Sequence, residues 1–359
     1  MQYLSLKNPV LTIAISSLFL SAAVQAQTSN QASKPAADEK ATAVIVTGTR
    51  VANRSVTDTS APVDVISAES LQNSGVTEIN QALSIALPSL NFPRPGLTDG
   101  TDTIRPATLR GLGPDQTLVL VNSKRRHASS LVNVNGTVGR GTAAVDLNTI
   151  PTAIVKNIEV LRDGASAQYG SDAISGVINL RLRQDRDGGE ATLSYGERIT
   201  SYDFIPGTPP TGATWSAPGT SRSRHDGNTT TASIWKGFSF GESGYVTVAA
   251  ELKDQKHTER GGWDFRQQYP LVSGAFDPRE KDFNRFDAWY GEPELKQDTV
   301  FVNAGETLSG GTKIYAWASY QKRDAVSAGN FRRALQDQKY HFDLSERVLA
   351  TNCATCRRL

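Results

Sequence analysis

The chain has 359 residues, and its 38 Lys and Arg residues against 36 Asp and Glu residues leave a formal net charge of +2. A balance this close to neutral excludes a strongly basic surface, so we expect no nucleic-acid partner. The mean hydropathy of −0.36 is typical of a water-soluble chain. It does not exclude membrane-spanning strands, because such strands alternate apolar and polar residues.

Residues 1–26 have the layout of a secretory signal peptide. Lys7 precedes an apolar stretch from Val10 to Val24, and Val24-Gln25-Ala26 is a small-residue cleavage pattern. The apolar stretch is shorter than the roughly 20 residues of a membrane-spanning helix, which disfavours the alternative of a membrane anchor. We therefore expect cleavage after Ala26, followed by a flexible polar leader at residues 27–42.

Residues 43–183 show the mixed pattern of an α+β domain. Ser67 and Thr77 are placed to cap two helices, because Ser and Thr side chains accept hydrogen bonds from the first free backbone N–H groups. The predicted elements are a strand at 62–66, helices at 67–73 and 77–86, and strands at 117–121, 158–161 and 176–182. Two long irregular loops, at 91–106 and 124–146, separate them, and loops of this length often carry function.

From residue 184 onward the sequence alternates with a period of two. About five strands are predicted, at 189–198, 229–240, 245–256, 298–308 and 312–323. Tight turns at 241–244 and 309–311 alternate with loops of about 30 and 40 residues. Outer-membrane barrels have this asymmetry, with short turns at one end and long loops at the other. Aromatic residues near the strand ends, including Trp235 and Trp317, fit the girdle that such barrels place at the membrane surface.

Three motifs resemble the TonB-dependent receptors of the bacterial outer membrane. They are Val44-Ile45-Val46-Thr47-Gly48-Thr49-Arg50, then Leu109-Arg110-Gly111 before the strand 118–121, and then Ile158–Gly170 followed by Ser175–Leu180. The resemblance covers roughly residues 43–335. It implies an α+β plug domain with its coupling segment at 43–183, followed at 184–359 by antiparallel transmembrane β-barrel strands. Those strands would form an incomplete barrel of the 22-stranded type.

The same resemblance implies the energy-coupled uptake of a scarce nutrient, such as an iron-siderophore complex, across the outer membrane. The expected partners are TonB with its inner-membrane energising proteins, outer-membrane lipid and a small-molecule ligand. The residues expected to couple to TonB are Val44, Ile45, Val46 and Thr47. They are β-branched or hydroxylated and could add to the edge of another sheet. The alternative is an ordinary first strand of the plug.

Two further groups of residues receive roles from the resemblance. Charges in otherwise well-packed motifs need partners, so the residues expected to lock the plug to barrel carboxylates are Arg110, Glu159 and Arg162. The residues expected to face the ligand from plug loops are Arg94, Asp99, Asn133 and Asn135. The alternative for both groups is ordinary solvated surface.

The sequence offers no enzyme site. It has no Gly-x-x-x-x-Gly-Lys phosphate loop and no Gly-x-Ser-x-Gly nucleophile elbow. His127, His225, His257 and His341 are scattered without ligand spacing, so we expect no catalytic residue, no metal site and no cofactor. Cys353 and Cys356 supply only two of the four ligands of a structural zinc site, and a small loop disulfide or a chance tail sequence is favoured.

Two other readings stay open. One is a soluble periplasmic binding module made of the plug, and the other is a surface adhesin that uses the long loops. The chain ends in Thr355-Cys356-Arg357-Arg358-Leu359, whereas complete receptors of this class end on an aromatic residue. We therefore expect a fragment, an interrupted gene or a shifted reading frame.

Overall fold

The computed structural model describes residues 63–73, 78–91, 100–134, 139–286 and 290–329. It also describes the short strands at 44–45 and 54–55 and the isolated residues 94, 96–98, 137, 333 and 335. The expected export signal, the leader, Cys353 and Cys356 lie outside these ranges. Within them, no helix has the length and apolar character needed to cross a membrane.

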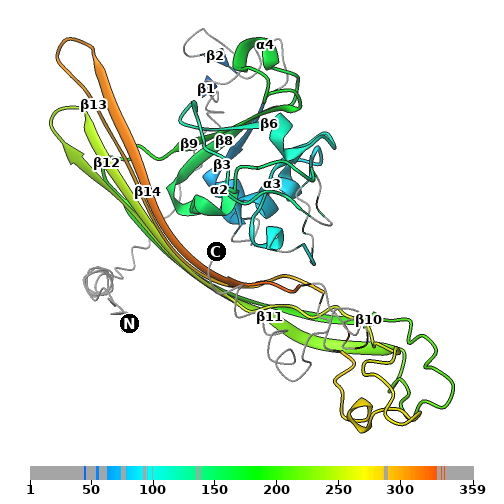
Figure 1. Ribbon diagram of the computed structural model, residues 1–359. Coiled ribbons are helices and arrows are strands. Elements are labelled where there is room, and N and C mark those ends of the chain that lie inside the picture. The colour runs from blue at the N-terminus through cyan, green and yellow to red at the C-terminus, as the bar shows by residue number, and fades with distance from the viewer. Residues whose placement is uncertain are drawn as a thin grey trace, which may run out of the picture. The chain divides into compact units, whose positions relative to one another are not determined.

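A five-stranded sheet forms the centre of the plug, in the order β3-β8-β9-β6-β7 (Figure 1). The strands are β3 (Val63–Ser67), β6 (Thr117–Val121), β7 (Lys124–Arg125), β8 (Val155–Leu161) and β9 (Gly176–Leu182). β6 runs parallel to β9, and the other neighbours are antiparallel. Gly176, the first residue of β9, has φ of +143°, and a Cβ there would lie 2.3 Å from the carbonyl oxygen of Leu161. The close approach of β9 to β8 at this position therefore requires glycine.

Short helices cover one face of this sheet. α2 (Ala68–Asn73) begins after Ser67, whose Oγ accepts from the backbone N–H of Ser70 at 3.2 Å, as predicted. α3 (Ile79–Ala86) begins after Glu78 rather than Thr77, and the Glu78 side chain makes no capping hydrogen bond. Thr77, the predicted cap, lies outside the described residues, and the Glu78 carboxylate is available to other partners.

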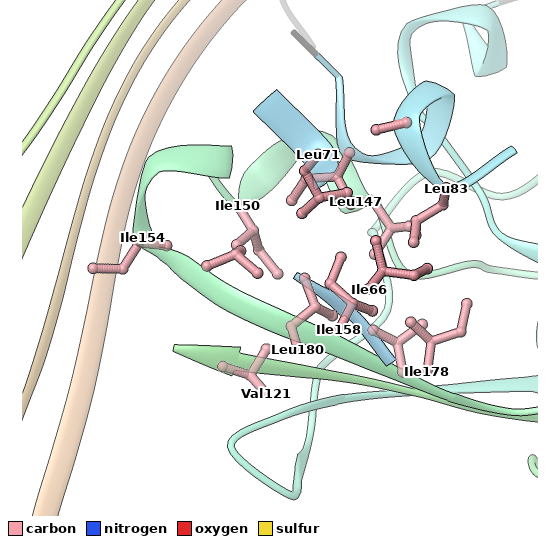
Figure 2. Close-up of a cluster of buried hydrophobic side chains, with 14 of the residues drawn as sticks. Ile66, Leu71, Leu83, Val121, Leu147, Ile150, Ile154, Ile158, Ile178 and Leu180 are labelled. Carbon is pink, nitrogen blue, oxygen red and sulfur yellow. The ribbon is translucent and has the colours of Figure 1, made fainter. Parts of the chain in front are cut away.

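An aliphatic core lies between these helices and the sheet (Figure 2). Leu71 and Leu83 from the helices face Ile158, Ile178 and Leu180 from β8 and β9. All five side chains are almost completely buried. Smaller elements complete the plug: α4 (Ser166–Tyr169), the paired strands β4 (Leu90–Asn91) and β5 (Thr108–Leu109), and 3-10 turns at Thr101–Thr103, Pro114–Gln116, Leu147–Thr149 and Thr152–Ile154.

Five long strands form a second sheet, which we call the wall sheet (Figure 1). They are β10 (Gly189–Asp203), β11 (Ser221–Phe240), β12 (Gly244–Gln255), β13 (Glu294–Thr307) and β14 (Lys313–Val326). Neighbours in sequence pair antiparallel throughout. β10 and β11 are longer than predicted, because their polar ends continue to pair beyond a shift in register between Gly196 and Arg198, so the loop between them shortens to residues 204–220.

The two faces of the wall sheet differ in chemistry. Its inner face is buried and mainly polar; on β12 and β13 it carries Thr247, Glu251, Lys253, Gln255, Gln297, Thr299 and Asn303, with Ala249, Leu295 and Phe301 between them. Over a central band its outer face is apolar: Val246, Val248, Ala250, Leu252, Val300, Val302 and Ala304 on the same strands. Beyond this band, toward the long loops, the same face carries Asp254, Lys296 and Asp298. The edge strands continue this face with exposed Leu193, Ile314 and Tyr320. A polar buried face beside an apolar exposed face is the pattern of strands that meet lipid on the outside.

Candidate functional site at the contact between plug and wall

Glu78 of the plug is the centre of a buried charge cluster that reaches the wall sheet. Its Oε1 accepts from Nζ of Lys253, on β12, at 2.6 Å. Its Oε2 accepts from Arg94 Nη2 at 2.7 Å and lies 3.4 Å from Arg105 Nε. The Glu78 and Lys253 side chains are only 7% and 5% exposed. A buried charge of this kind persists only where partners compensate for its lost hydration, so plug and wall each supply what the other needs.

The electrostatics of this cluster keep both signs charged. Burial raises the pKa of Glu78, but Arg105, Lys253 and Arg94 outweigh burial and hold the pKa far below its usual range. Burial lowers the pKa of Arg105, but Glu78, Glu292 and Asp146 outweigh it and raise the pKa above its ordinary value.

A second set of polar contacts joins the plug to β13 and β14. Arg323 Nη1 on β14 donates to Asp146 Oδ2 at 2.8 Å and to the Thr103 carbonyl at 3.0 Å. The other Asp146 oxygen accepts from the backbone N–H of Arg105 at 3.1 Å. Asn303 Nδ2 on β13 donates to the carbonyl of Arg183 at 2.8 Å. These hydrogen bonds satisfy polar groups of the inner face that water would otherwise have to reach.

Cations of the plug also lie over aromatic rings of the wall. The guanidinium carbon of Arg183 is 4.1 Å from the ring centroid of Trp235, and that of Arg126 is 5.4 Å from Trp317. Trp235 is 9% exposed and belongs to the same buried cluster as the plug core. The prediction that Trp235 and Trp317 form a membrane girdle is therefore wrong, because their positions in the alternation turn them toward the plug.

The two long loops of the wall sheet, residues 204–220 and 256–293, pack on each other, and we call them the loop lobe. Arg285 lies 4.1 Å from the ring centroid of Trp215, and its Nη2 donates to Glu280 Oε2 at 2.6 Å. Trp215 Nε1 donates to the carbonyl of Phe265 at 3.1 Å. Trp215, Glu280 and Arg285 are buried, so this contact is an internal core of the lobe rather than an open binding surface.

The residues predicted to lock plug to barrel make the contacts described here within the plug. Arg110 donates to the carbonyl of Arg162 at 3.2 Å, and Arg162 Nε lies 2.5 Å from Asp64. Glu159 is buried and accepts from Asn179 at 3.3 Å. Both arginine side chains are more than 40% exposed. Among the described residues, the ion pairs of these two arginines are with the plug carboxylates Asp163 and Asp64, and their predicted contacts with barrel carboxylates stay a prediction. A contact of Glu159 with the barrel stays a prediction.

The predicted ligand-facing residues separate in the structure. Arg94 is 25% exposed and bridges Glu78 to Glu292, which it meets at 2.6 Å, so it faces a site that carboxylates already fill. Asn133 is 1% exposed and its amide donates to Thr142 Oγ1 at 3.3 Å. The Asn133 side chain therefore holds its own loop together in this structure, and ligand contact by Arg94 and Asn133 stays a prediction. Asp99 and Asn135 lie outside the described residues.

Part of the predicted coupling segment is described as backbone. β1 (Val44–Ile45) pairs antiparallel with β2 (Arg54–Ser55), Val44 opposite Ser55. Val46 and Thr47 lie outside the described residues. The strand character of the segment is therefore present, and its role in coupling stays a prediction.

Sequence reasoning missed Glu78, Lys253, Asp146 and Arg323, the residues that join plug and wall. A signal for Lys253 was available, since it is a cation on the predicted alternation of β12 at a position that cannot face lipid. No comparable local signal marks Glu78 or Asp146. Across the described ranges, no group of His, Cys, Asp and Glu side chains has the arrangement of a metal site.

Comparison with known proteins supports the same assignment for the plug. Residues 55–177 match the family described as TonB-dependent receptor plug domain. Over 171 residues, the chain is 30% identical to the probable TonB-dependent siderophore receptor PirA of Acinetobacter baumannii, covering 48% of this chain and 22% of that relative. The resemblance first drawn from three motifs is thereby confirmed.

The chain has a partial likeness to two solved structures of siderophore receptors. The ferric enterobactin receptor PfeA of Pseudomonas aeruginosa is 18% identical, with a TM-score of 0.49 over 75% of this chain and 35% of its own. The siderophore receptor PirA of Pseudomonas aeruginosa is 18% identical, with a TM-score of 0.39 over 74% and 34%. Both TM-scores are below 0.5, so the fold assignment rests on the described plug and wall sheet and not on these two structures. The chain spans well under half the length of each of these relatives.

Proposed function

We propose that this chain, whose residues 55–177 are a plug domain of the TonB-dependent receptor type, belongs to a receptor that imports an iron-siderophore complex across the outer membrane. The observation that carries the proposal is the wall sheet with a polar inner face, met by plug charges, and an apolar outer face. A sheet of that kind suits a lipid surround and a plugged, hydrophilic lumen.

Energy would enter through the coupling segment. Because Val44 and Ile45 have strand character, the segment could add to a sheet edge of TonB through backbone hydrogen bonds. A pull on this segment would act on the plug, which polar contacts and cation–aromatic contacts hold to the wall. Contacts of this kind can break and re-form in water, so the plug can leave its seat and return.

The test uses the producing bacterium with its gene altered at the chromosomal locus. Deletion should abolish growth on at least one ferric siderophore under iron limitation, and loss of TonB should have the same effect. Ile45→Pro removes a backbone donor from the coupling segment, so it should stop uptake while binding persists. Conservative Ile45→Val is the matched control and should keep uptake.

The other two readings predict different outcomes. A soluble periplasmic module would fractionate with the periplasm, and its loss would leave siderophore uptake intact. An adhesin would bind its target without TonB or a proton gradient, and Ile45→Pro would have no effect on its role. Either result would contradict the transport proposal.

A further inference from the structure

One carboxylate ties the loop lobe to the plug. Glu292 lies at the end of the loop 256–293, two residues before β13. It accepts from Arg94 Nη1 of the plug at 2.6 Å and from Arg198 Nη2 of β10 at 2.9 Å. Arg105 Nη2 of the plug lies 3.8 Å from its other oxygen. Three guanidinium groups from separate parts of the chain therefore converge on a single acid.

The backbone beside Glu292 is pressed against the plug. A Cβ on Gly96 of the plug would lie 2.9 Å from the backbone nitrogen of Gly291, so the two backbones touch with no side chain between them. The Glu292 N–H donates to Thr258 Oγ1 at 2.8 Å, and the Thr258 N–H donates to the Glu292 carbonyl at 3.1 Å. These bonds join the two ends of the loop. A change at the Glu292 carboxylate thus acts on the base of the whole loop.

The arginines around Glu292 are suited to exchange one anion for another. The Arg198 and Arg94 side chains are 44% and 25% exposed, so a solute can reach them. Arg105 Nη2 is buried and has no hydrogen-bond acceptor. Burial raises the pKa of Glu292, but Arg94, Arg105 and Arg198 outweigh it and lower the pKa, so the group stays ionised. Guanidinium groups bind carboxylates, and they also bind other groups with planar or clustered anionic oxygens.

We propose that Glu292 holds the place of an anionic oxygen group of the cargo, which displaces it from Arg94 and Arg198 and so releases the loop from the plug. This inference rests on the proposed function and narrows the substrate class to anionic iron chelates. Without cargo, Glu292 keeps the loop base on the plug. With cargo bound, its anionic group takes the place of Glu292 on Arg94 and Arg198, and the loop is no longer held to the plug. The cargo-bound state therefore differs from the empty state in the position of this loop.

The test measures the binding of an anionic and of a neutral iron chelate to the purified full chain in detergent. A ferric tris-catecholate is trianionic, and a ferric tris-hydroxamate is neutral. Glu292→Gln removes the competing charge and keeps the shape, so it should bind the anionic chelate about tenfold more tightly and the neutral one unchanged. Arg198→Gln should weaken only the anionic chelate, by about tenfold. The matched control is Glu294→Gln, which removes an acid paired with Lys256 and should change neither affinity.

Hydrogen exchange gives a second measure that does not depend on affinity. The Thr258 and Glu292 amides should exchange faster in Glu292→Gln without ligand, and faster in the wild-type chain once the anionic chelate is bound. Equal affinities of wild type and Glu292→Gln for the anionic chelate, with unchanged exchange, would overturn this inference and leave the proposed function standing. Failure of both chelates to bind the wild-type chain would overturn the iron-chelate function together with the inference.

Discussion

In the plug, the side chains between the helices and the sheet are aliphatic, whereas those between the plug and β12–β13 are mostly amides, hydroxyls and charges. Both regions are buried to a similar degree. The aliphatic core lies between parts of one domain that fold together, and apolar burial is its main stabilising term. The polar contact lies between two parts that, under the proposed function, must separate. Burial alone therefore does not distinguish a permanent core from a contact that separates. The chemistry of the buried atoms distinguishes them.

The largest expected effect comes from removing Glu78. Glu78→Ala leaves Lys253 without its carboxylate in a buried site, so we expect a loss of about 3–5 kcal/mol in the free energy of unfolding. Urea unfolding of the full chain in detergent measures it. The double variant Glu78→Gln with Lys253→Gln should lose less than the sum of its two single variants, because the buried ammonium is removed together with its carboxylate. A loss equal to that sum would contradict the coupling.

Neighbouring positions on β14 sharpen the contrast between the two faces. Tyr320 is 56% exposed on the outer face, whereas Gln321 faces the plug and donates to the Asn148 carbonyl at 3.1 Å. Tyr320→Arg should cost about 2–4 kcal/mol for insertion in lipid. Gln321→Arg, the matched control, keeps a donor at the same depth and should insert normally. Heat-modifiable migration and outer-membrane recovery measure insertion. Equal insertion defects in the two variants would contradict the assignment of Tyr320 to the outer face and Gln321 to the inner face.

An acid titration separates the two buried regions without any substitution. Because neighbouring cations lower the pKa of Glu78 and Glu292 in the folded chain, their stabilising contribution is complete above the unfolded pKa, about 4.3, and is lost as the pH falls below it. Proteolysis at the plug–wall contact should thus increase as the pH falls below about 4. Proteolysis that stays unchanged as the pH falls from about 5 to about 2 would contradict the assignment.

Trp235 tests the cation–aromatic contact, which is weaker. Trp235→Leu keeps an apolar side chain and removes the ring under Arg183, so beyond lost packing we expect a cost of about 0.5–2 kcal/mol. Trp235→Phe should recover part of it. A double-mutant cycle with Arg183→Gln isolates the pair, and zero coupling would exclude it as a contributor to plug seating.

The smallest effect is expected at Arg162. Its pair with Asp64 is exposed and lies within the plug, so Arg162→Gln should change the free energy of unfolding by about 0–1 kcal/mol. The plug–wall contact should be unaffected in proteolysis. A loss as large as that of Glu78→Ala would instead support the prediction that Arg162 locks the plug to the barrel.

Local pattern predicted most of the fold. The strands 117–121 and 176–182 match β6 and β9, and Ser67 caps α2, because alternation, β-branching and capping chemistry are properties of neighbouring residues. The plug–wall site was predicted poorly for the same reason. Glu78 and Lys253 are separated by 175 positions, and their meeting depends on how the plug seats against the wall. Arg110 and Arg162 were chosen as charges within packed motifs; both side chains are more than 40% exposed here, and their contacts with the barrel stay a prediction.

Under the proposed function the plug moves away from the wall, and the polar inner face then determines what fills the space it leaves. Lys253, Thr247, Gln297 and Asn303 present groups that bulk water hydrates well, so an emptied wall would fill with solvent. An aliphatic wall of the same shape would repel water and favour collapse or adhesion to any apolar solute passing by. Under the proposed function, this wetting would let a hydrophilic cargo pass the strands without binding to an apolar surface. The returning plug would then displace mobile water and would not have to separate two apolar surfaces.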